Sequence, residues 1–88
     1  MAMLDQIFKS KGRLKVIKVI FKYGEANITK IANETGLSYE NVVRHLTELE
    51  KLGIIEEVKV GRVRIFRPAW INSTVRYIYN LLKSLNEI

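Results

Sequence analysis

The stretch ITKIANETGLSYENVVRHLTELEKLGIIEEVKVGRVRIFRP, residues 28–68, contains several structural signals in close succession. Ile28 and Ile31 recur at helical spacing, which predicts a short helix over Thr29–Glu34 with these side chains turned inward. Thr35-Gly36 should end this helix, because glycine readily adopts the left-handed conformation found at helix exits. The stretch therefore begins with one short helix and a tight turn.

A longer helix is expected directly after this turn. The Ser38 hydroxyl can accept backbone N–H groups, which predicts that Ser38 caps a helix running from Tyr39 to Leu52. At about 100° per residue this helix has two faces. One face carries Val42, Leu46, Leu49 and Leu52, and the opposite face carries Glu40, Val43, Arg44, Thr47 and Lys51. The second face is left free to contact a partner.

Two β-rich runs follow the helices. Ile54–Val60 is expected to pair with Arg62–Arg67 across a turn at Val60-Gly61, and Pro68 should end the pairing because proline does not continue a strand interior. Two helices joined by a Gly-containing turn and followed by a hairpin are typical of a winged helix-turn-helix.

The flanking segments predict further helices. Leu4–Tyr23 has helical periodicity with a possible break at Ser10-Lys11-Gly12, and a short extended piece is expected at Glu25–Asn27. We therefore expect a mainly α fold with a β-hairpin wing (α+β), a winged helix-turn-helix with an added C-terminal helix. It would form one domain over residues 1–88, with the helix-turn-helix at 29–52, the wing at 54–67 and the last helix at 72–88.

Residues 28–68 also resemble the ArsR/MarR-type winged-helix regulators, most clearly in IANETGLSYENVVRHLTELEKLGII and the basic hairpin after it. The resemblance implies DNA binding as a dimer and a role in transcription. By position it implies that Ser38, Tyr39, Glu40, Asn41, Val43 and Arg44 face the major groove, and the outward Thr47 joins this set. Arg and Asn side chains suit guanine and adenine edges, although Ser38 could serve as a cap alone and Arg44 could contact only the DNA backbone.

Basic residues surround the predicted hairpin turn. Lys59, Arg62, Arg64 and Arg67 would lie where a wing tip meets the DNA backbone or minor groove, with Arg62 and Arg64 as first candidates. The alternative is that these charges protect an exposed strand edge from aggregation. The two roles are compatible.

A dimer is expected because 88 residues support only a small core and both outer helices have surplus apolar positions. The predicted dimer residues are Val16 and Ile20 on the first helix and Val75, Ile78, Leu82 and Leu85 on the last. Two alternatives stay open. The first helix could be buried all round within one chain, and the last helix could simply fold back on the first.

Composition narrows the classes of function. The chain has no cysteine and one histidine, His45, which is expected to be a packing residue, so we predict no metal site and no cofactor. No catalytic motif is present, which predicts that the protein is not an enzyme. The longest wholly apolar run, Val19–Phe21, is too short for a bilayer, and a cytoplasmic location without membrane contact is expected. Abundant Lys and Ile favour a heat-adapted source such as a thermophilic archaeon.

The net charge of +6 fits a polyanionic partner. The leading hypothesis is a dimeric, double-stranded DNA-binding transcriptional regulator with its recognition helix in the major groove and its wing on the backbone or minor groove. Two alternatives remain: an architectural or chromatin protein of low sequence specificity, and a winged-helix module that binds a protein of the transcription machinery.

Overall fold

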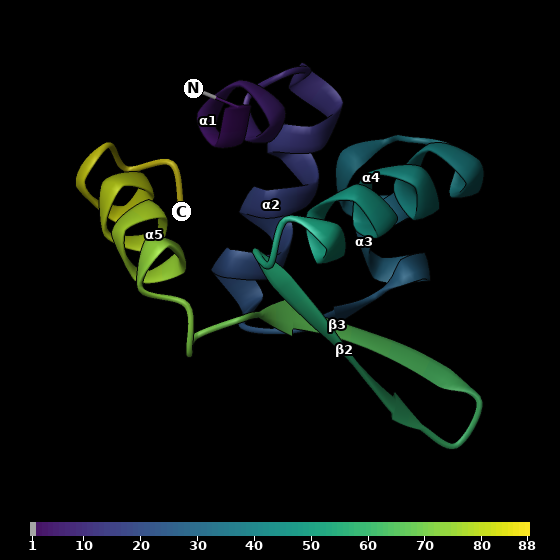
Figure 1. Ribbon diagram of the computed structural model, residues 1–88. Coiled ribbons are helices and arrows are strands. Elements are labelled where there is room, and N and C mark those ends of the chain that lie inside the picture. The colour runs from purple at the N-terminus through teal and green to yellow at the C-terminus, as the bar shows by residue number, and fades with distance from the viewer. Residues whose placement is uncertain (1) are drawn as a thin grey trace.

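The computed structural model describes residues 2–88, with side chains from Asp5 onward. The elements run in the order α1 (Ala2–Ile7), α2 (Lys11–Tyr23), β1 (Ala26–Asn27), α3 (Ile28–Thr35), α4 (Tyr39–Lys51), β2 (Ile55–Val60), β3 (Val63–Pro68) and α5 (Ser73–Ser84). The hairpin of β2 and β3 projects from the helical body, and α5 lies on the other side of α2 from α3 and α4 (Figure 1). The predicted winged helix-turn-helix with a C-terminal helix is confirmed.

The break near the N-terminus falls earlier than predicted. Helix α1 ends at Ile7 and α2 begins at Lys11, so Gly12 lies inside the first turn of α2. Ser10 explains the shift, because its Oγ accepts a hydrogen bond from the Arg13 backbone N–H at 3.1 Å and thereby caps α2. Ser10 was predicted to lie in a break of the helix, whereas it caps the start of α2.

The sheet has three antiparallel strands in the order β1-β3-β2, where the sequence predicted a hairpin alone. The extended piece before α3 forms β1 and pairs with β3 through Ala26↔Phe66 and Asn27↔Ile65. In the hairpin, Val60 pairs with Val63, so the turn is Gly61-Arg62 and not Val60-Gly61. Pro68 is the last residue of β3, a strand end where its missing N–H is tolerated.

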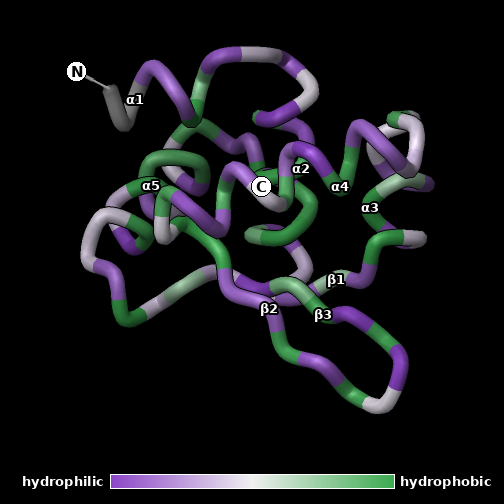
Figure 2. Tube along the Cα trace, turned by 45° about the vertical axis from the view of Figure 1, so that its right-hand side comes forward, coloured by the Kyte–Doolittle hydropathy of each residue, from purple (hydrophilic) through white to green (hydrophobic). Residues whose placement is uncertain are grey.

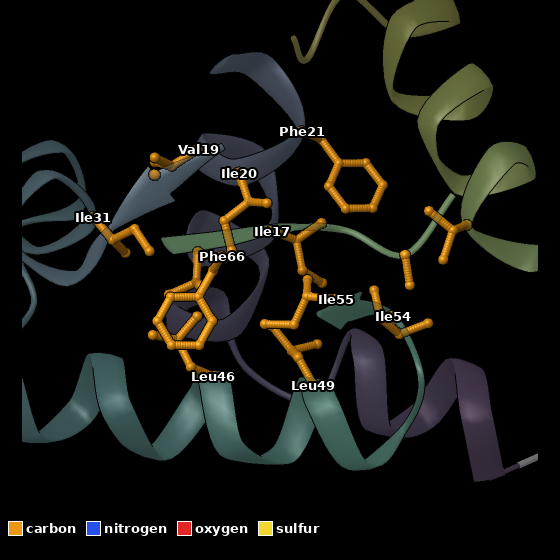
Figure 3. Packing of buried hydrophobic residues seen from close by; sticks show 14 of the residues in the cluster. Ile17, Val19, Ile20, Phe21, Ile31, Leu46, Leu49, Ile54, Ile55 and Phe66 are labelled. Atoms are coloured by element: carbon orange, nitrogen blue, oxygen red, sulfur yellow. The ribbon is translucent and has the colours of Figure 1, made fainter. Parts of the chain in front are cut away.

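The core lies between α2, α4 and the sheet. Ile17 and Ile20 of α2, Leu46 and Leu49 of α4 and Phe66 of β3 are buried and point toward one another (Figure 3). The apolar face predicted for α4 is therefore the core face, except that Leu52 is only partly buried. This packing fixes α4 against the body and leaves its opposite side outward.

Helix α5 folds back on α2 within the same chain. Val75, Ile78 and Leu82 are buried in the common core, and Trp70 and Tyr79 pack around Phe21 with ring centroids 6.0 and 6.4 Å from its ring. Tyr77, also on α5, is 75% exposed.

The predicted dimer residues therefore need correction. Val16, Ile20, Val75, Ile78 and Leu82 are all buried inside the single chain, and of the six only Leu85 is exposed. The alternative in which the last helix folds back on the first describes the structure, because these buried positions lie in the core of one chain and Tyr79 of α5 packs beside Phe21 of α2. In the described part of the chain no helix is both long and apolar enough to cross a membrane.

Candidate nucleic-acid interface

The turn between α3 and α4 is fixed by local hydrogen bonds. Gly36 takes a left-handed conformation, with φ of 75°, and its N–H donates to the Ala32 carbonyl oxygen at 2.9 Å. The Ser38 Oγ accepts from the Asn41 backbone N–H at 3.2 Å, which confirms the predicted cap. Because both helix ends are satisfied and Leu37 packs against the core between them, α4 starts at a defined angle to α3.

The outward face of α4 carries most of the side chains predicted to contact DNA. Ser38, Tyr39, Glu40, Arg44 and Thr47 are exposed. Asn41 is half-buried, and Val43 packs partly against the core, so Val43 offers less surface than the sequence indicated. The Thr47 hydroxyl donates to the Val43 carbonyl oxygen at 2.9 Å and is thus engaged within its own helix.

Two of the wing arginines are held by acidic neighbours on the facing strand. Arg64 donates from Nε and Nη2 to the two carboxylate oxygens of Glu57, at 2.7 and 3.2 Å, and Arg67 Nε donates to Glu56 at 2.6 Å. The hydrogen bond from Arg64 lowers the pKa of Glu57, and the same contact raises the pKa of Arg64. Both groups therefore stay charged, and the cation of Arg64 is largely compensated.

The other two wing cations are unpaired. Lys59 and Arg62 are exposed, and neither forms an ion pair with any carboxylate of the described residues. Hydrophilic and hydrophobic positions alternate along the projecting hairpin (Figure 2). The wing thus offers Lys59 and Arg62 to an anionic partner more readily than Arg64.

A cleft of about 270 Å³ lies between the wing and the helix-turn-helix. Its lining comes from β1 and the start of α3, from the start of α4 and from the wing, and consists of Asn27, Ile28, Thr29, Tyr39, Arg62, Val63 and Arg64. Asn27 and Thr29 were not among the predicted site residues. Asn27 caps α3 by accepting from the Lys30 N–H at 2.8 Å, which a capping pattern could have shown, but only the pairing of β1 with β3 brings this helix start beside Arg62.

His45 is a packing residue, as predicted. It is 6% exposed, and its Nδ1 accepts a hydrogen bond from Arg13 Nε at 3.4 Å. Burial, helped by the charges of Arg13 and Arg44, lowers the pKa of His45, which keeps the ring neutral at pH 7. Among the residues from Asp5 onward no three metal-binding side chains come together.

The capped helix pair, the wing and the cleft between them define a winged helix-turn-helix protein. The chain belongs to the HVO_A0114 family, whose model matches residues 9–69. No curated protein matches the sequence.

Solved structures share the fold at low sequence identity. PagR of Bacillus anthracis, described as a transcriptional repressor, is 22% identical with a TM-score of 0.77 over 91% of this chain and 87% of its own. HlyU from Vibrio cholerae N16961 is 18% identical with a TM-score of 0.80 over 93% and 85%. Mb0332 from Mycobacterium bovis, described as a homodimeric winged helix-turn-helix DNA-binding domain and possible ArsR-family regulator, is 20% identical with a TM-score of 0.74 over 97% and 79%. The winged helix-turn-helix fold that the resemblance implied is confirmed.

Proposed function

We propose that this protein is a dimeric transcriptional regulator that binds double-stranded DNA in the cytoplasm. The observation that carries the proposal is the exposed start of α4, which stands clear of the core and is flanked by the cleft containing Arg62. A protruding helix beside a basic hairpin matches the shape of duplex DNA, because the major groove admits one helix and the adjacent backbone lies within reach of the wing.

Helix α4 would supply the sequence-reading contacts. Arg44 is exposed and forms no ion pair with the described residues. A guanidinium can bond two acceptors on guanine, while Asn41 can bond adenine. Tyr39 and Ser38 lie at the helix start, where hydroxyl groups reach phosphates. Glu40 is the exception, since a carboxylate near phosphates is favourable only if it accepts a hydrogen bond from cytosine.

The wing and α3 would supply contacts that do not depend on sequence. Lys59 and Arg62 carry free charge toward the DNA backbone, and Thr29 lies in the first turn of α3, where backbone N–H groups favour a phosphate. A net charge of +6 on 88 residues adds long-range attraction to the polyanion.

The dimer would form through the outer face of α5. Ile71, Tyr77, Leu81 and Leu85 are exposed apolar residues just before, along and just after this helix. We assign a second copy of the chain as the occupant, because the structurally similar Mb0332 domain is described as homodimeric and because a small domain gains stability by sharing apolar surface. Two copies would present two recognition helices to two half-sites.

Selection of bound fragments from sheared genomic DNA, followed by sequencing, tests the proposal. We expect a short sequence with two-fold symmetry to be enriched in the retained pool. The salt dependence of binding then separates the alternatives, since an architectural protein would bind all fragments alike with a steep slope. A module that binds only proteins would retain no DNA, and this result would contradict the proposal.

A further inference from the structure

A second cleft, of about 430 Å³, lies between the start of α2 and the side of α4. It is lined by Lys9, Ser10, Arg13, Arg44, His45 and Glu48, and it shares no residue with the cleft beside the wing. Its size falls within the range of small-molecule sites in proteins.

Arg13 is the unusual residue of this cleft, because it is a charged side chain only 5% exposed. Its Nη1 donates to the Gln6 carbonyl oxygen at 2.7 Å and its Nε donates to His45, and among residues 6–88 no carboxylate forms an ion pair with it. Both acceptors are neutral. A buried guanidinium without a counter-ion is costly, and an anion in the cleft would remove that cost.

One nitrogen of Arg13 is available to such an anion. Nη2 forms no hydrogen bond with the described residues. Every side-chain nitrogen or oxygen of these residues that is sealed from solvent has a hydrogen-bond partner, so Nη2 is not one of the sealed atoms. Nη2 is therefore accessible to solvent, and Arg13 lines the cleft.

The charge of the lining fits a doubly charged anion. Lys9, Arg13 and Arg44 are cations, Glu48 is the one carboxylate, and His45 is neutral at pH 7, so the cleft carries a surplus of two positive charges. Glu48 also lies 3.6 Å from the Lys51 ammonium group on the next turn, which compensates part of its charge. A phosphate group matches this charge and accepts hydrogen bonds from all three cations.

We propose that this cleft binds the phosphate group of a small molecule through Arg13, Lys9 and Arg44. Arg13 is only 5% exposed, so we expect it to be reached more readily by a small free phosphate than by the backbone phosphates of a rigid duplex. Because Arg44 belongs to the outward face of α4, phosphate in the cleft also weakens DNA binding. This effect on DNA binding rests on the proposed function, whereas phosphate binding does not.

His45 provides a local reporter, since it is the only histidine in the sequence and lies in the cleft. The measurement is an NMR titration that follows the chemical shifts of the His45 imidazole protons. Sodium phosphate is added at pH 7.5 and compared with sodium chloride at equal ionic strength. We expect a saturable shift with phosphate alone, with half-saturation on the order of 1 mM. Equal shifts with both salts, or no saturation, would overturn the proposal.

Variants assign the effect to the cleft. Lys9→Gln removes an exposed charge at the rim without touching the core, and should weaken phosphate binding by about 5–10-fold, the loss of one charge-assisted hydrogen bond. Lys15→Gln removes the same charge from an exposed site on α2 outside the cleft and should change binding by less than twofold. Unchanged binding in Lys9→Gln would contradict the site.

DNA binding by fluorescence anisotropy identifies the source of the phosphate. In phosphate-free buffer of fixed ionic strength, Lys9→Gln should bind DNA like the wild type, and added phosphate should weaken the wild type more than the variant. If Lys9→Gln weakens DNA binding without added phosphate, the cleft holds a DNA phosphate and the small-molecule proposal fails. If neither the wild type nor Lys9→Gln binds DNA, the proposed function fails. The NMR titration of His45 then still decides whether the phosphate site exists.

Discussion

Arg44 and His45 are neighbours in the chain that have opposite environments. Helical geometry turns Arg44 to solvent and His45 into the contact between α4 and α2, where it accepts a hydrogen bond from Arg13. Arg44 can therefore be replaced without disturbing the core, whereas protonation of the buried His45 should make the stability of the fold depend on pH. Each of the two residues leads to a separate prediction.

Replacing Arg44 with alanine should remove sequence discrimination. We expect a loss of about 1–3 kcal/mol of discrimination at one base position, because a bidentate contact to guanine is worth that much, and a smaller loss on non-specific DNA. Competition binding against variants of the selected site at fixed salt measures both quantities, with Lys15→Ala as the matched control outside the interface. Equal weakening on every sequence would make Arg44 a backbone contact.

His45 should make the protein less stable in mild acid. Its pKa is lowered in the folded state, so between that value and the ordinary pKa of 6.5 the unfolded chain binds more protons than the folded one. The stabilisation is complete above pH 6.5 and is lost as the pH falls through the folded-state pKa. Urea unfolding at pH 5, 6 and 7.5 should show this decline.

His45→Gln should flatten the decline, because the amide oxygen of glutamine can still accept from Arg13 but does not titrate in this range. A variant with the same pH dependence as the wild type would show that another group is responsible.

The wing contains two kinds of cation, and they should respond differently to mutation. Arg64 is tied to Glu57 across the hairpin, so Arg64→Ala should mainly destabilise the fold, by about 0.2–1 kcal/mol for a partly exposed ion pair. Among the described residues, neither Lys59 nor Arg62 forms a hydrogen-bonded ion pair of this kind. Removing both should weaken binding to all duplexes and reduce the salt slope by roughly 0.9 for each lost phosphate contact.

Binding isotherms between low and moderate salt measure this slope, and thermal unfolding measures the stability of the same variants. The wild-type slope should persist in Arg64→Ala. If the Lys59→Ala/Arg62→Ala double variant also keeps the wild-type slope, its two cations only protect the strand edge and do not contact phosphates.

One face of α5 packs in the core, and the opposite face is exposed to solvent. Leu82 is 4% exposed and packs in the core, whereas Leu81, one residue before it, is 50% exposed. Leu82→Glu should therefore unfold the chain, because burying a charge in an apolar core costs several kcal/mol. Leu81→Glu should keep the fold and convert the dimer to a monomer.

Circular dichroism reports the fold of both variants, and analytical ultracentrifugation at micromolar concentration reports their mass. A wild-type chain that sediments as a monomer would contradict the dimer. A dimer that survives Leu81→Glu combined with Leu85→Glu would place the subunit contact on a surface other than α5.

Local signals in the sequence were sufficient for the helix-turn-helix and the wing. Ser38 and Gly36 act on backbone groups within four residues of themselves, and the spacing of Val42, Leu46 and Leu49 marks the core face of α4 whatever covers it. These patterns also indicated the outward position of Arg44. Interactions of this short range can be read from the order of residues alone.

The remaining features depend on residues far apart in the chain. An apolar stripe shows that a helix face must be covered, but it does not show by what. The stripes of α2 and α5 therefore predicted a dimer contact, although both are covered by the core of the same chain. Strand register decided that Arg64 meets Glu57 and that Asn27 reaches the wing. Packing of α2 on α4 placed Arg13 against His45, 32 residues away, because a side chain's partners are set by which surfaces exclude water together.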